Sequence, residues 1–480
     1  MDLSSLRIGI VHSLVGKNDG VSIVIDQTVR TMVEQIRIPL GNIFFLAAHA
    51  PSRFNTTLDE VFWHKNDANK EILRSFSDGA TEDLEDTILT HAAHAEEVIA
   101  DFVEANRLDL LIAHNMSHPY NFVAAVGLGR YLEKRRNDGI VSPRCLLWWH
   151  DSHFERELFR DPNPVVREYL RYVPSPLVDG IVFINTRQPE LARRHFEQYG
   201  RKGSKQFFDR KTAVIPNTCD IRWDWHAADR TGGLIYPPQD SFNRTFLSDV
   251  GVSRAAAELG MDPDHTILLL QHTRVVPRKR IDVAIDFAFR LADISRQRGQ
   301  SKCVVLLVSG PSGDEQGEYR EELRRHFRVA GSRREDLKVA FILGEQTIFP
   351  HREIVVDRKY YSFSEVPAIV AARGGLGTYF SEVEGFGNNL LEMIGMALPA
   401  VINRFEVYES DLAGYGFRLP ATSGCELTDD VVEESYRLLT DIPYRNEVVL
   451  HNLEVLESKL GHRVMATKLE PLLHNLYIYE

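Results

Sequence analysis

The stretch Ser381-Glu-Val-Glu-Gly-Phe-Gly-Asn-Asn-Leu-Leu-Glu-Met393 combines a flexible turn with the start of a helix. Gly385 and Gly387 let a ligand approach the backbone closely, because neither residue carries a side chain. Asn388 and Asn389 are typical of helix N-termini, where backbone N–H groups lack partners within the helix. The stretch therefore predicts a turn between a strand and a helix at which a ligand binds.

Two carboxylates flank this turn. Glu384 stands before the two glycines, and Glu392 lies eight positions later, about one turn inside the predicted helix. Carboxylates accept hydrogen bonds from hydroxyl groups, so the pair can hold two hydroxyl-rich parts of one ligand. The spacing alone leaves a second interpretation open, a capped surface helix with two solvated glutamates.

A basic turn lies about a hundred residues earlier. The stretch Gln271-His-Thr-Arg-Val-Val-Pro-Arg-Lys-Arg-Ile-Asp282 follows a predicted strand and begins a predicted helix. It contains four cations, Arg274, Arg278, Lys279 and Arg280. A diphosphate at such a place is stabilised by side-chain charge and by the positive end of the helix dipole. For an isolated basic turn, the alternative is that some of these cations face only water.

Apolar runs of strand length alternate with segments of helical period along the rest of the chain, which is typical of α/β domains with parallel sheets. The predicted strands are residues 7–12, 43–47, 108–114, 144–149, 180–185, 212–215, 266–271, 303–309, 339–343, 368–372, 378–380 and 398–402. The predicted helices include residues 21–35, 81–106, 119–136, 189–199, 253–259, 280–297, 318–330 and 388–396. We expect an N-terminal Rossmann-like domain (1–225), a linker (226–262), a C-terminal Rossmann-like domain (263–445) and C-terminal helices (446–480).

Composition excludes several classes of protein. The 480 residues carry 56 Lys and Arg against 68 Asp and Glu, a formal net charge of −12, which disfavours a general nucleic-acid binder. No apolar run approaches the ~20 residues that cross a bilayer, and the first residues lack the pattern of a secretory signal, so we expect a cytoplasmic protein. The four cysteines are far apart, which predicts buried single thiols rather than a zinc site or disulfides.

Together the two motifs resemble those of the retaining GT-B glycosyltransferases of family 4, in which R-x-x-x-x-K is followed by E-G-F-G-x-x-x-x-E. Arg274 and Lys279 match the first motif, and the segment from Glu384 to Glu392 matches the second. The resemblance covers most of the chain, strongly in its second half. It implies two facing Rossmann-like domains with a cleft between them, and last helices that return to the N-terminal domain. It also implies a nucleotide diphosphate sugar as co-substrate, with no other cofactor and no metal.

The resemblance also implies roles for individual residues. Arg274 and Lys279 would bind the donor diphosphate, and Glu384 would bind hydroxyls of the donor hexose. Glu392 would bind the nucleotide ribose, and His150, at the end of a strand, would lie close to the transferred sugar. The alternative for His150 is a histidine bonded to a backbone carbonyl. The remaining donor-binding candidates are Gly20, Gly385, Phe386, Gly387, Asn388 and Asn389.

The chain departs from the family pattern in three places. Ahead of Glu384 the family often has Pro-Ser, whereas this sequence has Tyr379-Phe-Ser-Glu-Val. The family usually has paired glycines after the first strand, whereas here Gly16 and Gly20 are separated by three residues. The stretch 349–372 is longer and more basic than expected, so the family's base-recognising residues are not assigned to positions of this sequence.

Acceptor-binding candidates follow two strands of the first domain: Asn115, His118, Asn121, Asp151, His153 and Arg156. Each of these polar residues, taken singly, also fits a structural role.

The predicted reaction transfers a hexose from a UDP-, GDP- or ADP-sugar to a hydroxyl of a small soluble acceptor, with retention at the anomeric carbon and without a metal. Catalysis would consist mainly of positioning and of stabilising the leaving diphosphate. The main alternative is a non-catalytic nucleotide-sugar sensor or scaffold with the same fold.

Two other classes of enzyme are disfavoured. A metal-dependent enzyme would need a D-x-D pair, but Asp262-Pro-Asp264 precedes a strand and is interpreted as a turn. A dinucleotide-dependent oxidoreductase is disfavoured because no G-x-G-x-x-G follows the first strand. Membrane association is not favoured, and the oligomeric state is left open.

Overall fold

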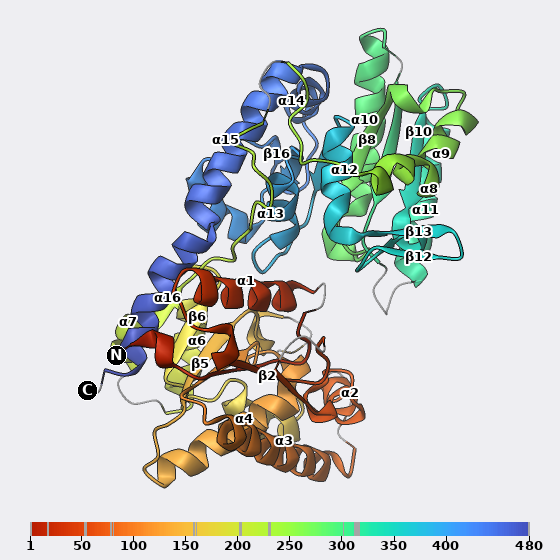
Figure 1. Cartoon of the computed structure of the whole chain (residues 1–480). Helices are drawn as coiled ribbons and strands as arrows, with labels where there is room; N and C mark the ends of the chain where they lie inside the picture. The colour runs from red at the N-terminus through yellow and green to blue at the C-terminus, as the bar shows by residue number, and fades with distance from the viewer. Residues whose placement is uncertain are drawn as a thin grey trace. The chain divides into compact units, whose positions relative to one another are not determined.

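The computed structural model describes residues 2–16, 19–51, 55–76, 79, 81–156, 159, 161–200, 204–228, 232–300, 302–311 and 317–478. The chain divides into two compact units. The first unit comprises Met1–Thr218 and His462–Glu480, and the second comprises Cys219–Gly461 (Figure 1). Each unit is built around a parallel sheet covered by helices.

The sheet of the first unit has the strand order β3-β2-β1-β4-β5-β6-β7. Its strands are β1 (Ile8–Val11), β2 (Ile43–Ala47), β3 (Thr56–Leu58), β4 (Leu110–His114), β5 (Arg144–Trp149), β6 (Gly180–Phe183) and β7 (Thr212–Val214). The helices are α1 (Gly20–Glu34), α2 (Asp67–Arg74), α3 (Leu84–Asn106), α4 (Phe122–Asn137), α5 (Pro164–Tyr169), α6 (Gln188–Gln198), α7 (Ser204–Arg210) and α16 (His462–Leu476). Every residue of β1, β4 and β6 is buried, as expected for central parallel strands.

The second unit contains a six-stranded parallel sheet of order β10-β9-β8-β14-β15-β16 and a small sheet of order β11-β13-β12. The strands are β8 (Thr266–Gln271), β9 (Cys303–Val308), β10 (Val339–Leu343), β11 (Ile348–Phe349), β12 (Glu353–Val355), β13 (Arg358–Ser362), β14 (Leu376–Tyr379), β15 (Ala400–Asn403) and β16 (Ala421–Thr422). The helices are α8 (Phe246–Asp249), α9 (Val252–Glu258), α10 (Ile281–Gln297), α11 (Gly317–Ser332), α12 (Val366–Ala372), α13 (Asn388–Gly395), α14 (Asp429–Thr440) and α15 (Ile442–Leu460).

The two Rossmann-like α/β sheets confirm the predicted fold class, but one predicted strand is wrong. Residues 368–372 belong to helix α12. Just before this helix, Ser362 and Glu365 form a capping box, and Pro367 stands in its first turn. These start signals favour a helix, whereas the apolar residues themselves fit a buried strand equally well. Sequence reasoning also overlooked β3, a three-residue polar strand at the edge of its sheet.

The boundaries between the units differ from those expected. Residues 226–262, expected to form a linker, belong to the second unit. Just before them, Trp223 donates a hydrogen bond from its indole N–H to the carbonyl of Gly395 over 2.9 Å, and Trp225 packs in an apolar cluster with Leu453 of α15. Helix α15 therefore belongs to the second unit, and only α16 joins the first. There, α16 lies beside α1 (Figure 1), and His462 Nδ1 lies 2.8 Å from the hydroxyl of Thr31 on α1.

Two further properties follow from the structure. All four cysteines are buried free thiols, as the sequence predicted. Across the part of the chain that the structure describes, no helix is both long enough and apolar enough to span a membrane.

Candidate active site

The two motifs found in the sequence meet because their strands are neighbours. Strands β8 and β14 pair in parallel, so the turns that follow them leave the same edge of the sheet. The backbone N–H of Glu382 donates a hydrogen bond to the carbonyl of Arg278 over 3.0 Å, which joins the two turns directly. Carboxyl ends of parallel strands are the usual place for ligands in such sheets.

At this edge, Glu384 is held between two cations. Its Oε1 is paired with Nζ of Lys279, and its Oε2 lies 3.1 Å from Nη1 of Arg278. The side chains of Lys279 and Glu384 are only 7% and 9% exposed. Because charges removed from water are costly unless they are paired, the two groups depend on one another. The sequence pointed to Lys279 and Glu384 separately, but it did not show that they form an ion pair.

The environment shifts the pKa values of both groups. Burial by itself raises the pKa of Glu384, but the charges and hydrogen bonds of Lys279, together with the charge of Arg278, outweigh this effect and lower it to about 2. Burial lowers the pKa of Lys279 to about 8, although the charge of Glu384 opposes the change. The charges of Arg278 and Arg274 add to this lowering. Glu384 is therefore ionised throughout the physiological range, whereas Lys279 loses its proton in mildly basic solution.

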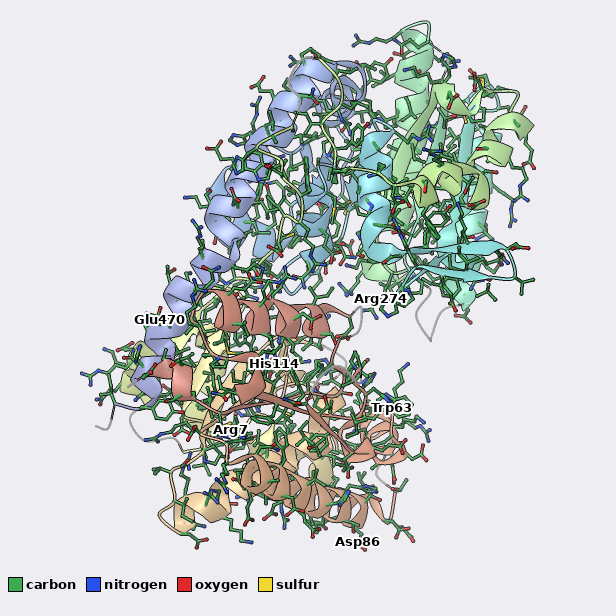
Figure 2. The ribbon with its side chains drawn as sticks, viewed as in Figure 1. Arg7, Trp63, Asp86, His114, Arg274 and Glu470 are labelled. Atoms are coloured by element: carbon green, nitrogen blue, oxygen red, sulfur yellow. The ribbon has the colours of Figure 1, made fainter. Side chains whose placement is uncertain are left out.

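Arg274 is the cation of this turn that is open to a ligand. Its side chain, labelled in Figure 2, is exposed. Within the described part of the chain, this side chain makes no hydrogen bond or ion pair. The turn that carries it is held by a hydrogen bond from the N–H of Val275 to the carbonyl of Pro311, over 3.1 Å. A Cβ on Gly310 would stand 2.2 Å from the carbonyl oxygen of Thr273, so only glycine fits beside this turn. The exposed guanidinium is therefore presented by a constrained backbone.

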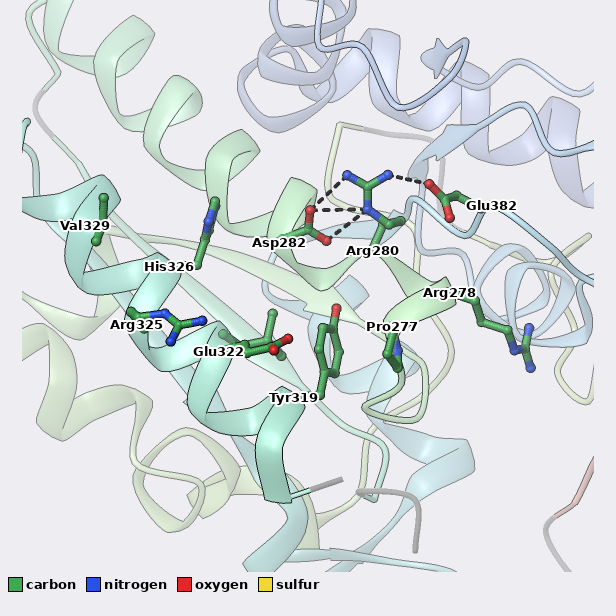
Figure 3. A pocket seen from close by; sticks show the side chains of 11 residues that line it. Pro277, Arg278, Arg280, Asp282, Tyr319, Glu322, Arg325, His326, Val329 and Glu382 are labelled. Atoms are coloured by element: carbon green, nitrogen blue, oxygen red, sulfur yellow. Dashed lines mark hydrogen bonds and ion pairs between the residues drawn. The ribbon is translucent and has the colours of Figure 1, made fainter. Parts of the chain in front are cut away.

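Arg280 is engaged elsewhere. Its guanidinium is paired with Asp282, with Nη2 2.9 Å from Oδ2, and with Glu382. These groups line a pocket of about 670 Å³ between the turn and helix α11, and Figure 3 shows Arg280 between its two carboxylates while Arg278 points away from them. The hydrogen bond with Asp282 raises the pKa of Arg280 further. Arg280 is thus neutralised locally, and it does not add free positive charge to the Lys279 edge.

Glu392, on the first turns of α13, is oriented by a residue that sequence reasoning did not single out. His272 Nε2 lies 3.3 Å from Oε2 of Glu392, and His272 Nδ1 lies 2.9 Å from the hydroxyl of Ser309. The ring of His272 is fully buried and stacks on Phe363, with 3.9 Å between ring centroids. The sequence signal that could have identified His272 is its position directly after β8, within the basic stretch 271–282.

The turn between Glu384 and α13 offers mainly its backbone. Gly387 has φ 106°, and a Cβ there would lie 3.1 Å from Phe405, so the position favours glycine. The side chain of Phe386 is buried in the core, and the amide of Asn389 donates to the carbonyl of His272 over 2.6 Å. Gly385 is exposed within the turn, and Asn388 is the first residue of α13. The structure therefore brings the donor-binding candidates of the second unit to one edge.

In the first unit, His150 follows β5 directly. Its Nε2 lies 3.1 Å from Nδ1 of His114, so it pairs with another imidazole rather than with a backbone carbonyl. Burial, aided by the nearby charge of His12, lowers the pKa of His150 to about 3. His150 is therefore neutral at physiological pH.

Five of the six acceptor candidates gather around the loops after β4 and β5. The N–H of Asp151 donates to Oδ1 of Asn115 over 3.2 Å, and the amide of Asn121 donates to the carbonyl of Asn115 over 3.0 Å. The carboxylate of Asp151 accepts a 2.6 Å hydrogen bond from Nε of Arg156 and lies 4.0 Å from Nε2 of His118. Asn115 has φ 59°, which asparagine tolerates better than most residues.

His153 and Gly20 are the remaining predicted residues of the first unit. The ring of His153 is buried, as are the side chains of His118 and Asn121, and it packs against Phe154 and His195. Gly20 is the exposed first residue of α1, but the carboxylate of Asp19 already accepts hydrogen bonds from the N–H groups of Val21 and Ser22, each over 3.1 Å. Because this carboxylate is negative and occupies the helix start, it disfavours the phosphate contact expected near Gly20.

The D-x-D string is a turn, as interpreted from the sequence. Residues Pro263–His265 form a short 3₁₀ helix before β8, and Asp262 caps it while its Oδ2 lies 3.2 Å from Nδ1 of His265. Within the described residues, no cluster of three or more His, Cys, Asp or Glu side chains is arranged to hold a metal ion.

The chain matches no family model. It is 25% identical over 446 residues to the mannosylglucosylglycerate synthase of Petrotoga mobilis, an alignment that covers 86% of each chain. It is 26% identical over 478 residues to the mannosylglucosylglycerate synthase of Thermotoga maritima, covering 94% of this chain and 95% of the relative.

Among solved structures, the chain is similar to Anabaena HepE in complex with UDP and glucose. The TM-score is 0.56 at 13% sequence identity, and the match covers 98% of this chain and 99% of HepE. The match therefore spans both sheets of this chain. The fold and these relatives together identify the chain as a glycosyltransferase with the GT-B fold.

Proposed function

We propose that the protein transfers a hexosyl group from a nucleotide diphosphate sugar to a hydroxyl of glucosylglycerate or a closely similar small acidic glycoside. The names of the two relatives favour mannose as the hexose. The observation that carries the proposal is the edge at which Lys279 and Arg278 hold Glu384 beside the exposed Arg274. We also propose retention at the anomeric carbon, independence of metal ions and membership of glycosyltransferase family 4.

The geometry suggests how a donor would be bound. Its diphosphate would contact Arg274 and Lys279, and a Lys279 ammonium shared with the diphosphate would leave oxygens of Glu384 free to accept hexose hydroxyls. Glu392, held by His272, would accept hydrogen bonds from the ribose hydroxyls. These contacts involve residues of the second unit only, so donor binding can be tested separately from acceptor binding.

In the proposed reaction, the bond between the anomeric carbon and the phosphate oxygen breaks as the acceptor oxygen bonds to the same face of that carbon. The acceptor proton passes to the leaving phosphate oxygen, and the nucleoside diphosphate departs. In the transition state, positive charge develops on the sugar and negative charge on the diphosphate. Arg274 and Lys279 would stabilise the negative charge of the leaving diphosphate.

The test incubates the purified full-length protein with UDP-, GDP- and ADP-hexoses and glucosylglycerate, and measures product by mass spectrometry and anomeric configuration by NMR. The proposal expects one donor to give a product that retains the donor's configuration, with unchanged rate in excess EDTA. Donor binding by calorimetry without product, for glucosylglycerate and for a panel of small sugar acids, would instead favour the sensor or scaffold.

The pH dependence of the reaction should report Lys279. The pKa of Lys279 is about 8, and only its protonated form attracts the diphosphate. We therefore expect kcat/KM for the donor to be highest below pH 8 and to fall as the pH rises through that value. Glu384, with a pKa of about 2, should not titrate in this range. The check is a profile from pH 6 to 10. Lys279→Arg stays charged throughout and should remove the fall, whereas an unchanged fall in that variant would assign it to another group.

A further inference from the structure

We propose that His114 is a positioning residue that sets the tautomer of His150, so that His150 presents an Nδ1–H to the ligand. This inference rests on the proposed function and on the family resemblance, which implies that His150 lies close to the transferred sugar. Figure 2 shows His114 inside the first unit, where it is the last residue of β4. No pattern in the sequence had marked it.

Packing fixes the position of the His114 ring. Strands β4 and β5 are paired in parallel with His114 opposite Trp148, and the two rings stack with 5.3 Å between centroids and 11° between planes. His114 is fully buried, whereas His150 keeps 8% of its surface exposed. The contact between His114 Nδ1 and His150 Nε2, at 3.1 Å, therefore supports the His150 ring from its buried side.

Both rings are neutral, so only one of the two facing nitrogens carries a hydrogen. Burial lowers the pKa of His114 well below its ordinary value and that of His150 to about 3. Each neutral imidazole has one N–H and one bare nitrogen. Either His150 donates from Nε2 to His114, or His114 donates from Nδ1 to His150.

The other nitrogen of His114 distinguishes these arrangements. His114 Nε2 is buried and has no hydrogen-bond partner among the residues that the structure describes. If His150 were the donor, His114 would carry its hydrogen on Nε2, which would leave a buried N–H without an acceptor, a rare defect in folded proteins. If His114 donates, that nitrogen is bare, and the hydrogen of His150 resides on Nδ1. The burial of His114 Nε2 therefore favours the arrangement in which His114 donates from Nδ1 to His150.

The chemical consequence is specific. A His150 that carries its hydrogen on Nδ1 can donate a hydrogen bond from that atom to a sugar or phosphate oxygen, but it cannot accept a proton there. Its other nitrogen is occupied by His114. His150 therefore acts as a fixed hydrogen-bond donor to the ligand and not as a general base.

The direct test is ¹⁵N NMR of the full-length protein labelled with ¹⁵N-histidine, with the His150 signals assigned by their loss in His150→Asn. We expect Nδ1 of His150 at the chemical shift of a protonated nitrogen and Nε2 at that of a bare one. In His114→Phe, which has no donor, this preference should disappear. A protonated Nε2 in the unaltered protein would overturn the inference, and so would an unchanged preference in His114→Phe.

Kinetics give a second measurement. His114→Phe should lower kcat by about tenfold, with a change in donor KM below about twofold, while His114→Asn, whose amide can replace the Nδ1–H, should recover part of the loss. Equal kcat values for these two variants would contradict the positioning role. A protein that shows the expected NMR signals but transfers no sugar would contradict the proposed function and leave the tautomer assignment standing.

The matched control is His195→Asn. His195 is also buried in the first unit, where its Nε2 lies 2.9 Å from the carbonyl of Pro174. We expect this variant to lower the melting temperature about as much as His114→Asn does, but to leave the tautomer of His150 and kcat unchanged. A shift of the His150 signals in His195→Asn would attribute the effect to general loosening of the unit and would overturn the inference.

Discussion

Replacing Lys279 by alanine should lower kcat/KM for the donor by about 10³-fold, because the variant removes a buried cation from the place where the charge of the leaving diphosphate would develop. Lys279 is the only lysine in the turn between β8 and α10, and it is 5% exposed. The measurement is steady-state kinetics at pH 7 with varied donor. A loss below about fivefold would remove Lys279 from the proposed mechanism.

The control for this variant is Arg280→Gln. Arg280 is adjacent in sequence, but its charge is neutralised by Asp282 and Glu382, and it faces the pocket beside α11 (Figure 3). We expect kcat/KM to change less than about threefold, since partly exposed ion pairs contribute little. If Arg280→Gln reduced activity as much as Lys279→Ala, any loss of positive charge from the turn would lower activity. That result would contradict the proposed contact between Lys279 and the donor diphosphate.

The variant Glu384→Gln should lose both activity and stability. Without the carboxylate, the buried ammonium of Lys279 and the guanidinium of Arg278 face one another uncompensated, so we expect a loss of about 3 kcal/mol in the free energy of unfolding. The loss of hydrogen bonds to hexose hydroxyls should lower kcat/KM by roughly 10²-fold. Urea unfolding and donor kinetics measure the two effects.

A double variant separates these effects. Lys279→Met combined with Glu384→Gln removes both charges of the buried pair, and methionine preserves much of the length of the lysine stem. The free energy of unfolding should return to within about 1 kcal/mol of the unaltered protein, while activity stays lost. The matched control is Glu382→Gln, whose carboxylate is 49% exposed, and it should cost less than about 1 kcal/mol. Additive losses in the double variant would show that the pair is not coupled.

Most of the fold could be predicted from local pattern. The strands of both large sheets were located except for β3 and the two-residue β16, because a parallel strand buried on both faces is a continuous apolar run. The misassigned segment 368–372 shows the limit of this signal, since short apolar runs fit a helix or a strand and the nearby capping box decides between them. The division into units was less predictable, because residues 226–262 are held by packing against α15 and neighbouring residues of the second unit rather than by any local period.

The sequence by itself determined which chemistry is present: two turns after strands, one basic and one with glycines between carboxylates. Only the tertiary structure decided which of these groups meet. Lys279 and Glu384 are 105 residues apart and pair because β8 lies beside β14, and His114 meets His150 because β4 lies beside β5. The strength of such contacts depends on distance and burial, and both are properties of packed neighbours rather than of positions along the chain. For that reason Arg280, equally basic in the sequence, is neutralised by its neighbours, whereas Arg274 remains open to a ligand.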